Sequence, residues 1–88
     1  PNKDQLPSIL SQALGNLSVL NQTTCTWADL DYSTRGRENW DPVLHMFRVS
    51  TMAAALTVPG GLKEHRQLAS AVHCALGVWI REDWQNPN

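Results

Sequence analysis

The sequence predicts an all-α protein with three main helices, and three observations support that fold class. Apolar side chains recur every three or four residues in three separate stretches, at about 7–20, 42–57 and 63–83. The segment Pro59-Gly60-Gly61 separates the second stretch from the third, and Pro and Gly are strong helix stops. A chain of 88 residues has room for one domain or less, so residues 1–88 are expected to form a single unit.

The first predicted helix, at about 7–20, is amphipathic. Its apolar residues fall at helical spacing and form one stripe, so one side of the helix is expected to pack on a core. The stripe consists of Leu6, Ile9, Leu10, Ala13, Leu14 and Leu17.

Residues 21–41 are expected to form a long loop, because Thr, Asp, Ser, Arg, Gly and Asn dominate most of the segment. Loops of this length inside a compact domain are usually functional or packed against another part of the protein. Asp41 and Pro42 then open the second helix. Asp is a favoured N-cap, and Pro at the first helical position loses no needed hydrogen bond.

The second and third predicted helices are apolar on more than one side. In the second, only His45, Arg48, Ser50 and Thr51 interrupt the apolar surface. Such a helix is normally buried on more than one side, and exposed faces of this kind would form a patch that soluble monomers avoid. We therefore expect a further neighbour: the remainder of the same protein, a second chain that completes it, or a second copy.

Composition excludes several classes of partner. The formal net charge is −1 and no basic cluster occurs, so nucleic acid is not expected as a partner. No apolar run reaches the length of a membrane span, so no membrane contact is expected. The first residues lack the basic and apolar regions of a signal peptide, and any such peptide is expected to have been removed.

The cysteines and two glycosylation sequons bear on the compartment. Cys25 and Cys74 could pair in an oxidising compartment, closing a loop of about fifty residues worth roughly 4 kcal/mol, or could be two buried thiols. Asn16-Leu17-Ser18 and Asn21-Gln22-Thr23 would accept glycans in a secreted eukaryotic protein, although such triplets also occur by chance. These features favour a secreted, extracellular protein.

The acidic residues at 29 and 31 resemble the start of a calcium loop but do not complete one. Thr34 stands at the position of the turn glycine, and Trp40 at that of the bidentate Glu. A different use of the two carboxylates is expected, either capping loop amides or pairing with an arginine. The candidate arginines are Arg35, Arg37 and Arg48.

His45 and Arg48 lie one helical turn apart and are expected to meet a carboxylate from the preceding loop. A hydrogen-bonded structural pair is favoured over a catalytic histidine. His65 and His73 lack the spacing of zinc ligands. No metal site, no cofactor and no catalytic residue are predicted within this chain.

The chain has four tryptophans, and three of them fall on predicted loops or helix ends. Trp27, Trp40 and Trp84 could stack on a sugar, but packing in a core is the commoner use of a large aromatic ring. Trp84 is the exception that we favour for sugar contact.

Three spaced motifs follow one another from Trp27 to Asn88, over roughly two thirds of the chain. The motifs are Trp27-x-Asp29-Leu30-Asp31-Tyr32, then Trp40-x-Pro42-x-x-His45-x-x-Arg48, and finally Trp79-Ile80-x-x-Asp83 with Asn86-Pro87-Asn88. In this order they resemble the N-terminal helical region of polysaccharide lyase family 8, which comprises hyaluronate, chondroitin and xanthan lyases. The resemblance implies that the three helices form part of an incomplete α/α toroid, a ring of helical hairpins.

The resemblance also implies an acidic polysaccharide in the toroid cleft and cleavage by β-elimination. In that family a base removes the proton α to the uronic carboxyl group, and the catalytic Asn, His, Tyr and Arg lie beyond the matched segment. Asn88 is carried over as a substrate-proximal residue, and Trp84 is added from its chemistry. The chain alone is therefore expected to be inactive.

The expected function is an N-terminal segment or subunit of a secreted polysaccharide lyase-like protein. Two alternatives stay open. The whole protein could bind acidic glycans without cleaving them, as a lectin does. The chain could instead be a small secreted helical effector or toxin that hides its apolar faces in a dimer.

Overall fold

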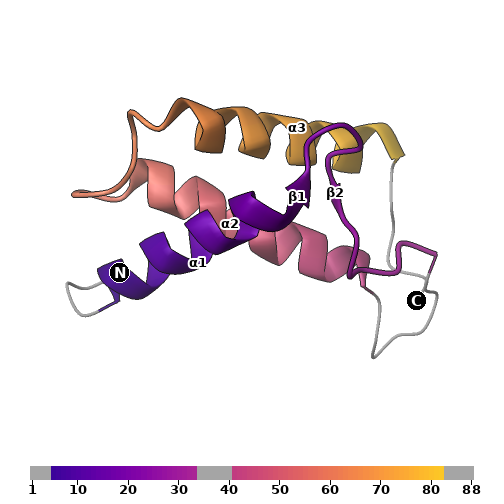
Figure 1. Cartoon of the computed structure of the whole chain (residues 1–88), viewed down its shortest axis with the longest axis horizontal. Helices are drawn as coiled ribbons and strands as arrows, with labels where there is room; N and C mark the ends of the chain where they lie inside the picture. The colour runs from indigo at the N-terminus through magenta and orange to yellow at the C-terminus, as the bar shows by residue number, and fades with distance from the viewer. Residues whose placement is uncertain (1–4, 34–40, 83–88) are drawn as a thin grey trace.

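A computed structural model describes residues 5–33 and 41–82, and it contains three helices arranged around a shared core (Figure 1). The helices are α1 (Leu6–Val19), α2 (Pro42–Thr57) and α3 (Arg66–Glu82). Helix α2 packs against both of the others. The mainly helical class predicted from the sequence is confirmed, with the addition of a small two-stranded sheet.

The helix boundaries follow the sequence closely in α2 and less closely at the start of α3. Helix α2 has the predicted limits, and α1 lies one residue earlier than expected at each end. Helix α3 begins at Arg66 rather than near Lys63. Its start is set by His65, whose Nδ1 accepts the backbone N–H of Leu68 at 3.1 Å and so satisfies one amide of the first turn.

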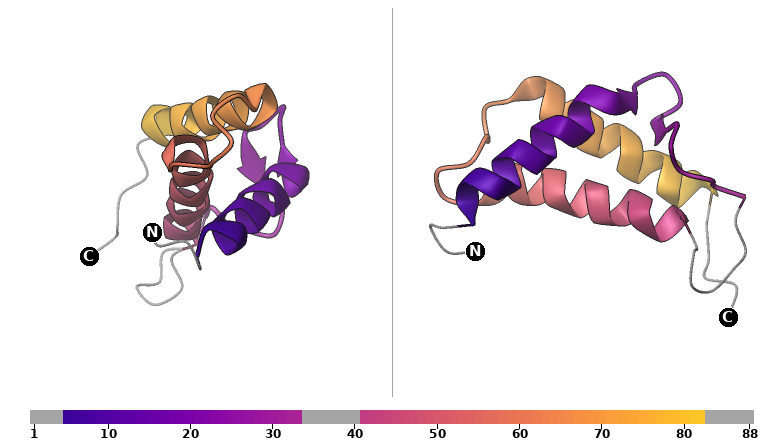
Figure 2. Two further views of the ribbon diagram at one scale, coloured as in Figure 1. Left: turned by 90° about the vertical axis from the view of Figure 1, so that its left-hand side faces the viewer. Right: turned by 60° about the horizontal axis from the view of Figure 1, so that its bottom comes forward.

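The expected loop over residues 21–41 is partly wrong, because its first part forms a β-hairpin. Strand β1 (Leu20–Asn21) pairs antiparallel with β2 (Thr26–Trp27). Figure 2 shows that α1 and this hairpin lie on the same side of the α2–α3 pair. The hairpin therefore extends the layer that α1 forms over one side of the α2–α3 pair.

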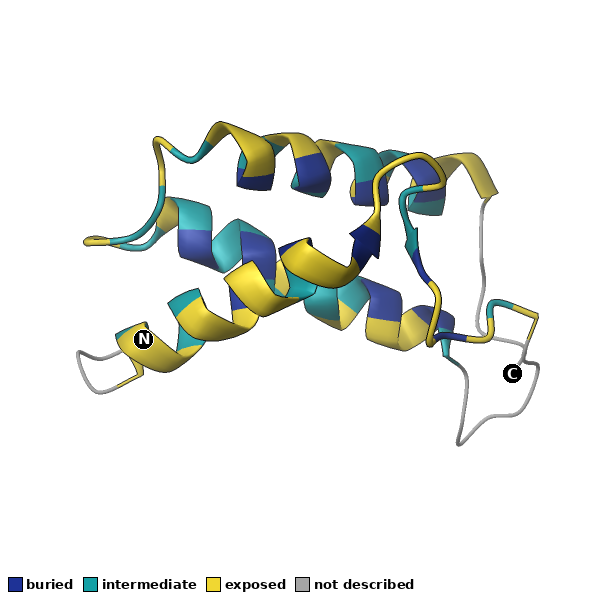
Figure 3. Cartoon of the chain, in the orientation of Figure 1, coloured by how far each residue is buried: buried dark blue, intermediate teal, exposed yellow. Residues whose placement is uncertain are grey.

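The core lies where the three helices and the hairpin meet (Figure 3). Among the described residues, His45 is the single buried polar or charged side chain, and it is 0% exposed. Its neighbours in the core are apolar. They include Ala13, Leu17, Leu20, Trp27, Leu30, Val49, Met52, Ala55, Leu68, Ala71 and Ala75.

Helix α2 is fully buried along one side only, within the part of the chain that the structure describes. Its buried residues span an arc of roughly 140° at 100° per residue. Phe47 lies nearly opposite His45 and is 62% exposed, while Val43 and Leu44 are also exposed. The prediction that this helix is buried on more than one side is therefore not met by α1, α3 and the hairpin alone.

A disulfide joins Cys25 at the hairpin to Cys74 of α3, with Cα atoms 5.4 Å apart. Of the two alternatives for these cysteines, the structure thus has the bridge rather than two thiols. Cys25 has φ 64°, a left-handed conformation that is uncommon outside glycine. The N–H of Cys25 donates to the carbonyl of Asn21 at 2.7 Å, which closes the turn.

Within 5–33 and 41–82, no helix combines the length and the apolar character needed to cross a bilayer.

Candidate functional site

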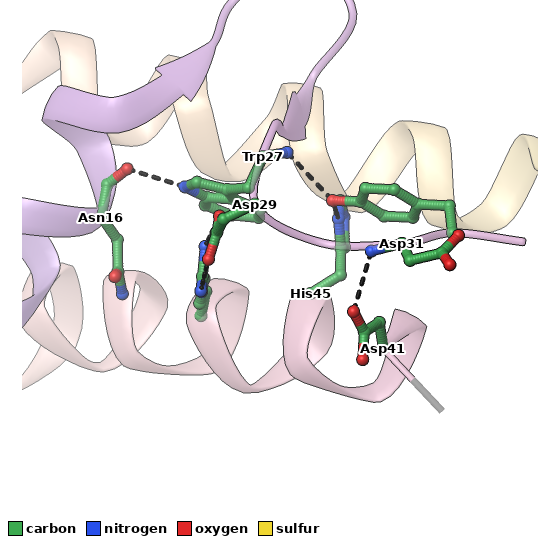
Figure 4. Close-up of polar contacts among 8 residues, drawn as sticks. Asn16, Trp27, Asp29, Asp31, Asp41 and His45 are labelled. Atoms are coloured by element: carbon green, nitrogen blue, oxygen red, sulfur yellow. Dashed lines mark hydrogen bonds and ion pairs between the residues drawn. The ribbon is translucent and has the colours of Figure 1, made fainter. Parts of the chain in front are cut away.

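The candidate site is a junction where the hairpin and the segment after it lie over the first half of α2 (Figure 4). We call it the histidine junction and define it by Trp27, Asp29, Tyr32, His45 and Arg48. The first three follow one another closely along the chain, and the last two lie one turn apart on α2. Two of the three motifs quoted above therefore meet here in space.

The imidazole of His45 bridges two other parts of the chain. Its Nε2 lies 2.7 Å from the carbonyl oxygen of Ala75 in α3, and its Nδ1 lies 2.9 Å from the hydroxyl of Tyr32. A carbonyl can only accept, so Nε2 carries the proton and donates it to Ala75. Nδ1 is then the acceptor for the Tyr32 hydroxyl, and the ring is neutral with both nitrogens bonded.

Burial favours this neutral form. Removal from water lowers the pKa of His45 below its ordinary value of 6.5, against the opposing effect of the bond to Ala75, and the positive charge of Arg48 lowers it further. Among the described residues, the partners of the two ring nitrogens are a tyrosine hydroxyl and a backbone carbonyl. Residues 34–40 of the preceding loop lie outside the described residues, so the expected contact of His45 with an acidic loop residue stays a prediction.

Tyr32 connects the histidine to the hairpin. Its hydroxyl oxygen accepts the backbone N–H of Trp27 at 3.0 Å while its proton goes to His45. Burial raises the pKa of Tyr32, so the hydroxyl stays protonated and able to donate. The indole N–H of Trp27 donates to the carbonyl of Asn16 at 2.9 Å, which ties the hairpin to α1.

Aromatic rings of three described residues contact His45. Trp27 and Tyr32 meet the imidazole edge-on, with centroids 5.1 and 5.6 Å away. Trp79 of α3 is stacked on it at 5.9 Å with an interplanar angle of 25°. Trp27 is only 1% exposed, so its ring packs in the core. Of the two expected uses of this ring, core packing and sugar stacking, the structure has the first.

Arg48 pairs with Asp29 at the edge of the junction. The guanidinium donates two hydrogen bonds to the carboxylate, at 2.9 and 2.7 Å, and its carbon lies 5.4 Å from the centroid of the Trp27 ring. These bonds lower the pKa of Asp29. The expected pairing of this arginine with a loop carboxylate is confirmed.

Asp31 and Asp41, the other carboxylates described in this part of the chain, bind backbone amides. Asp31 accepts the backbone N–H of Ser33 at 3.0 Å, and Asp41 accepts that of Asp31 at 2.8 Å. Asp41 is therefore not the side-chain N-cap that the sequence suggested: its own backbone is helical, with φ −57° and ψ −32°. An N-cap residue needs an extended backbone for its side chain to reach the following amides.

No group of three or more His, Cys, Asp or Glu side chains able to hold a metal ion occurs within the ranges 5–33 and 41–82.

A surface hollow of about 380 Å³ adjoins the junction. Arg48 and Asp29 form part of its wall, together with Asn16, Val19 and Ala28. Because the charge of Arg48 is already matched by Asp29, the hollow presents a neutral ion pair to a ligand. His45 is fully buried, does not line the hollow and has both ring nitrogens bonded, so it is suited to holding elements together rather than to proton transfer with a ligand.

The remaining predicted site residues divide into two groups. Asn16 lies on α1 and Asn21 ends β1, so both sequons are described. Trp84 and Asn88, the predicted substrate contacts, lie outside the described residues, as do Trp40, Arg35 and Arg37.

Sequence reasoning missed the roles of Tyr32 and Trp79 at the junction. Tyr32 was visible only as part of a motif, and no periodic pattern relates it to His45. Trp79 lies four residues after Ala75, the carbonyl that binds His45, so the helical repeat itself places both over the same ring.

Comparison of the chain with models of protein families finds no match, and no curated protein and no solved structure matches it.

Proposed function

We propose that this chain is a helical segment of a secreted polysaccharide lyase-like protein that acts on acidic polysaccharides by β-elimination, with its catalytic residues outside these 88 residues. The observation that carries the proposal is the histidine junction. Residues that define the resemblance to polysaccharide lyase family 8 contact one another through hydrogen bonds, an ion pair and ring contacts. These contacts give a physical reason why residues of separate motifs occur together in one chain.

Exposed apolar side chains support the part of the proposal that concerns a larger helical assembly. Phe47 on α2 is 62% exposed and Ile80 on α3 is 68% exposed, with Leu44 and Leu76 near 40%. Under the proposal, further helical hairpins of an α/α toroid cover these faces. They come from the remainder of the same protein or from a second chain. Covering them would remove apolar surface from water, which is the dominant favourable contribution to such packing.

The proposed contacts with the polysaccharide are Asn88 and Trp84. Neither position is described, so their support is the family resemblance for Asn88 and the chemistry of the indole ring for Trp84. An indole face can pack on the apolar face of a sugar ring, and an amide can bond its hydroxyl groups.

The test compares the chain alone with the complete secreted protein that contains it. Intact-mass measurement and N-terminal sequencing first identify any polypeptide that accompanies the chain. Each sample is then incubated with hyaluronan, chondroitin sulfate or alginate, and the ultraviolet absorbance of unsaturated uronate is followed. The proposal predicts no product from the chain alone and product from the complete protein.

Variants separate substrate contact from folding. Asn88→Ala and Trp84→Ala in the complete protein should lower product formation, while Gln85→Ala serves as the matched control. Binding of polysaccharide without any product would favour the lectin-like alternative. Absence of both binding and product in the complete protein would contradict the carbohydrate proposal.

The exposed apolar faces also support a second candidate, a small secreted effector that forms a dimer through them. Sedimentation equilibrium of the isolated chain distinguishes the two. A stable dimer that Phe47→Ser dissociates, without polysaccharide binding, favours the effector. A chain that stays monomeric at high protein concentration would contradict the effector candidate.

A further inference from the structure

We propose that Asn21 is an N-glycosylation site and that Asn16, in the other sequon, is not modified. The sequence alone treats the two sequons alike. The inference concerns the chain in a eukaryotic secretory compartment, where its disulfide would also form. It does not depend on the polysaccharide proposal.

The position of Asn21 in the hairpin exposes its side chain. Leu20 pairs with Trp27 and Asn21 pairs with Thr26. Successive side chains of a strand point to opposite faces, and here Leu20 and Trp27 take the buried face, at 7% and 1% exposure. Asn21 and Thr26 therefore occupy the other face, and Asn21 is exposed.

The turn after β1 orients the carboxamide of Asn21. Its Oδ1 accepts the backbone N–H of Thr23 at 2.9 Å and that of Thr24 at 3.1 Å. Thr23 is the hydroxyl residue of the sequon, so the turn brings both sequon side chains to the same short, exposed segment. No hydrogen bond from Nδ2 of Asn21 to a described residue is present, and this nitrogen is the atom that would carry the sugar.

Asn16 has a different environment. It lies inside α1 and is only partly exposed, and its carbonyl accepts the indole N–H of Trp27. In a helix, residues two apart point about 200° away from each other, so Ser18 lies on the other side from Asn16. The Ser18 hydroxyl also donates to the carbonyl of Gly15 at 2.8 Å. In the sequon at Asn16, the amide and the hydroxyl therefore do not face the same side of the helix.

The co-reactant is a lipid diphosphate-linked oligosaccharide. Nδ2 of Asn21 forms a bond to the anomeric carbon of the first sugar and loses one proton. The bond between that carbon and the phosphate oxygen breaks, and the lipid diphosphate leaves with the electron pair. No oxidant or reductant is needed.

For the test, mammalian cells secrete the 88-residue chain fused to an N-terminal signal sequence that is removed on secretion. Secreted and cell-retained material are both digested with peptide N-glycanase in heavy-oxygen water, which converts a glycosylated Asn to a labelled Asp. Peptide mass spectrometry should find the label at position 21 and none at position 16. A label at Asn16, or the absence of one at Asn21, would overturn the proposal.

Matched variants check the assignment without changing either asparagine. Thr23→Ala should abolish the mass shift on gels, and Thr24→Ala in the same turn should retain it. Ser18→Ala should leave the shift unchanged. A shift that survives Thr23→Ala, or disappears with Ser18→Ala, contradicts the assignment.

Discussion

The two sides of α2 differ in the opposite sense from what side-chain polarity alone suggests. On the inner side His45 is completely buried, and on the outer side Phe47, two residues later, is 62% exposed. The histidine is buried because Tyr32 and Ala75 satisfy both of its ring nitrogens. The phenylalanine is exposed because no described element packs over it. Burial at α2 is thus decided by the available partners, and hydropathy is the weaker guide.

The largest expected effect tests this contrast with two aromatic truncations. Trp27→Ala removes a buried ring, its indole hydrogen bond to the Asn16 carbonyl and its contact with the Arg48 guanidinium, and should lower the free energy of unfolding by about 3–5 kcal/mol. Phe47→Ala on the outer side should change it by no more than about 0.5 kcal/mol in the isolated chain. Denaturant unfolding followed by circular dichroism measures both. Equal losses would show that the two sides contribute alike.

The second effect concerns the disulfide between the hairpin and α3, on the inner side of α2. Replacing both Cys25 and Cys74 by Ser removes the bridge that holds the hairpin on α3, and should cost about 2–5 kcal/mol. The double variant is chosen because a single replacement leaves a reactive thiol. Thermal melts with and without reductant provide the control, since reductant should lower the Tm of the wild type and leave that of the variant unchanged. A variant as stable as the wild type would show that packing alone holds the hairpin.

The third effect is a pH dependence that belongs to the inner side. The pKa of His45 in the folded chain lies below the ordinary value of 6.5, so the unfolded chain binds this proton first as the pH falls. The free energy of unfolding should therefore decrease from about pH 7 downward, by at most about 1.4 kcal/mol per pH unit, until the folded-state pKa is reached.

His45→Gln is the matched variant for this pH dependence, because Gln keeps a donor and an acceptor and does not titrate in this range. Of the other groups at the junction, Asp29 has a pKa below 3.8, and Tyr32 and Arg48 titrate well above neutral pH, so none interferes. Denaturant unfolding between pH 4.5 and about pH 7.5 should show a smaller slope for the variant. An unchanged slope would assign the pH dependence to other groups.

The smallest expected effect lies at the rim between the two sides. Asp29→Asn breaks the ion pair with Arg48, but Asp29 is 62% exposed, so the loss should be about 0.5 kcal/mol at low salt. At about 1 M salt the wild type and the variant should converge, because the charges are screened. A larger loss that persists in salt would indicate that Arg48 depends on this pair for its position over Trp27.

The sequence predicts the helical elements well because their signals are local. Helix α2 has a proline at its start and a Pro-Gly-Gly stop at its end, and its observed bounds match the prediction. The Arg48–Asp29 pair could be predicted because an arginine on an apolar helix that follows an acidic loop needs a carboxylate partner.

Other features could not be read from local patterns. Strands of two residues are too short to show an alternating period, so the hairpin was taken as part of a loop. The bond from Tyr32 to His45 crosses 13 positions without a repeating pattern, and the cap of α3 uses a histidine ring that is not a favoured N-cap.

The bond from His45 to the Ala75 carbonyl fixes the axial register of α2 against α3. Sliding α3 by one helical turn, about 5.4 Å, would place a different carbonyl and a different side chain over the imidazole. Another carbonyl would then have to accept the Nε2 proton, and the imidazole would lose its stacking on Trp79. The contacts of His45 with Ala75 and Trp79 therefore occur together only in this axial register of α2 and α3.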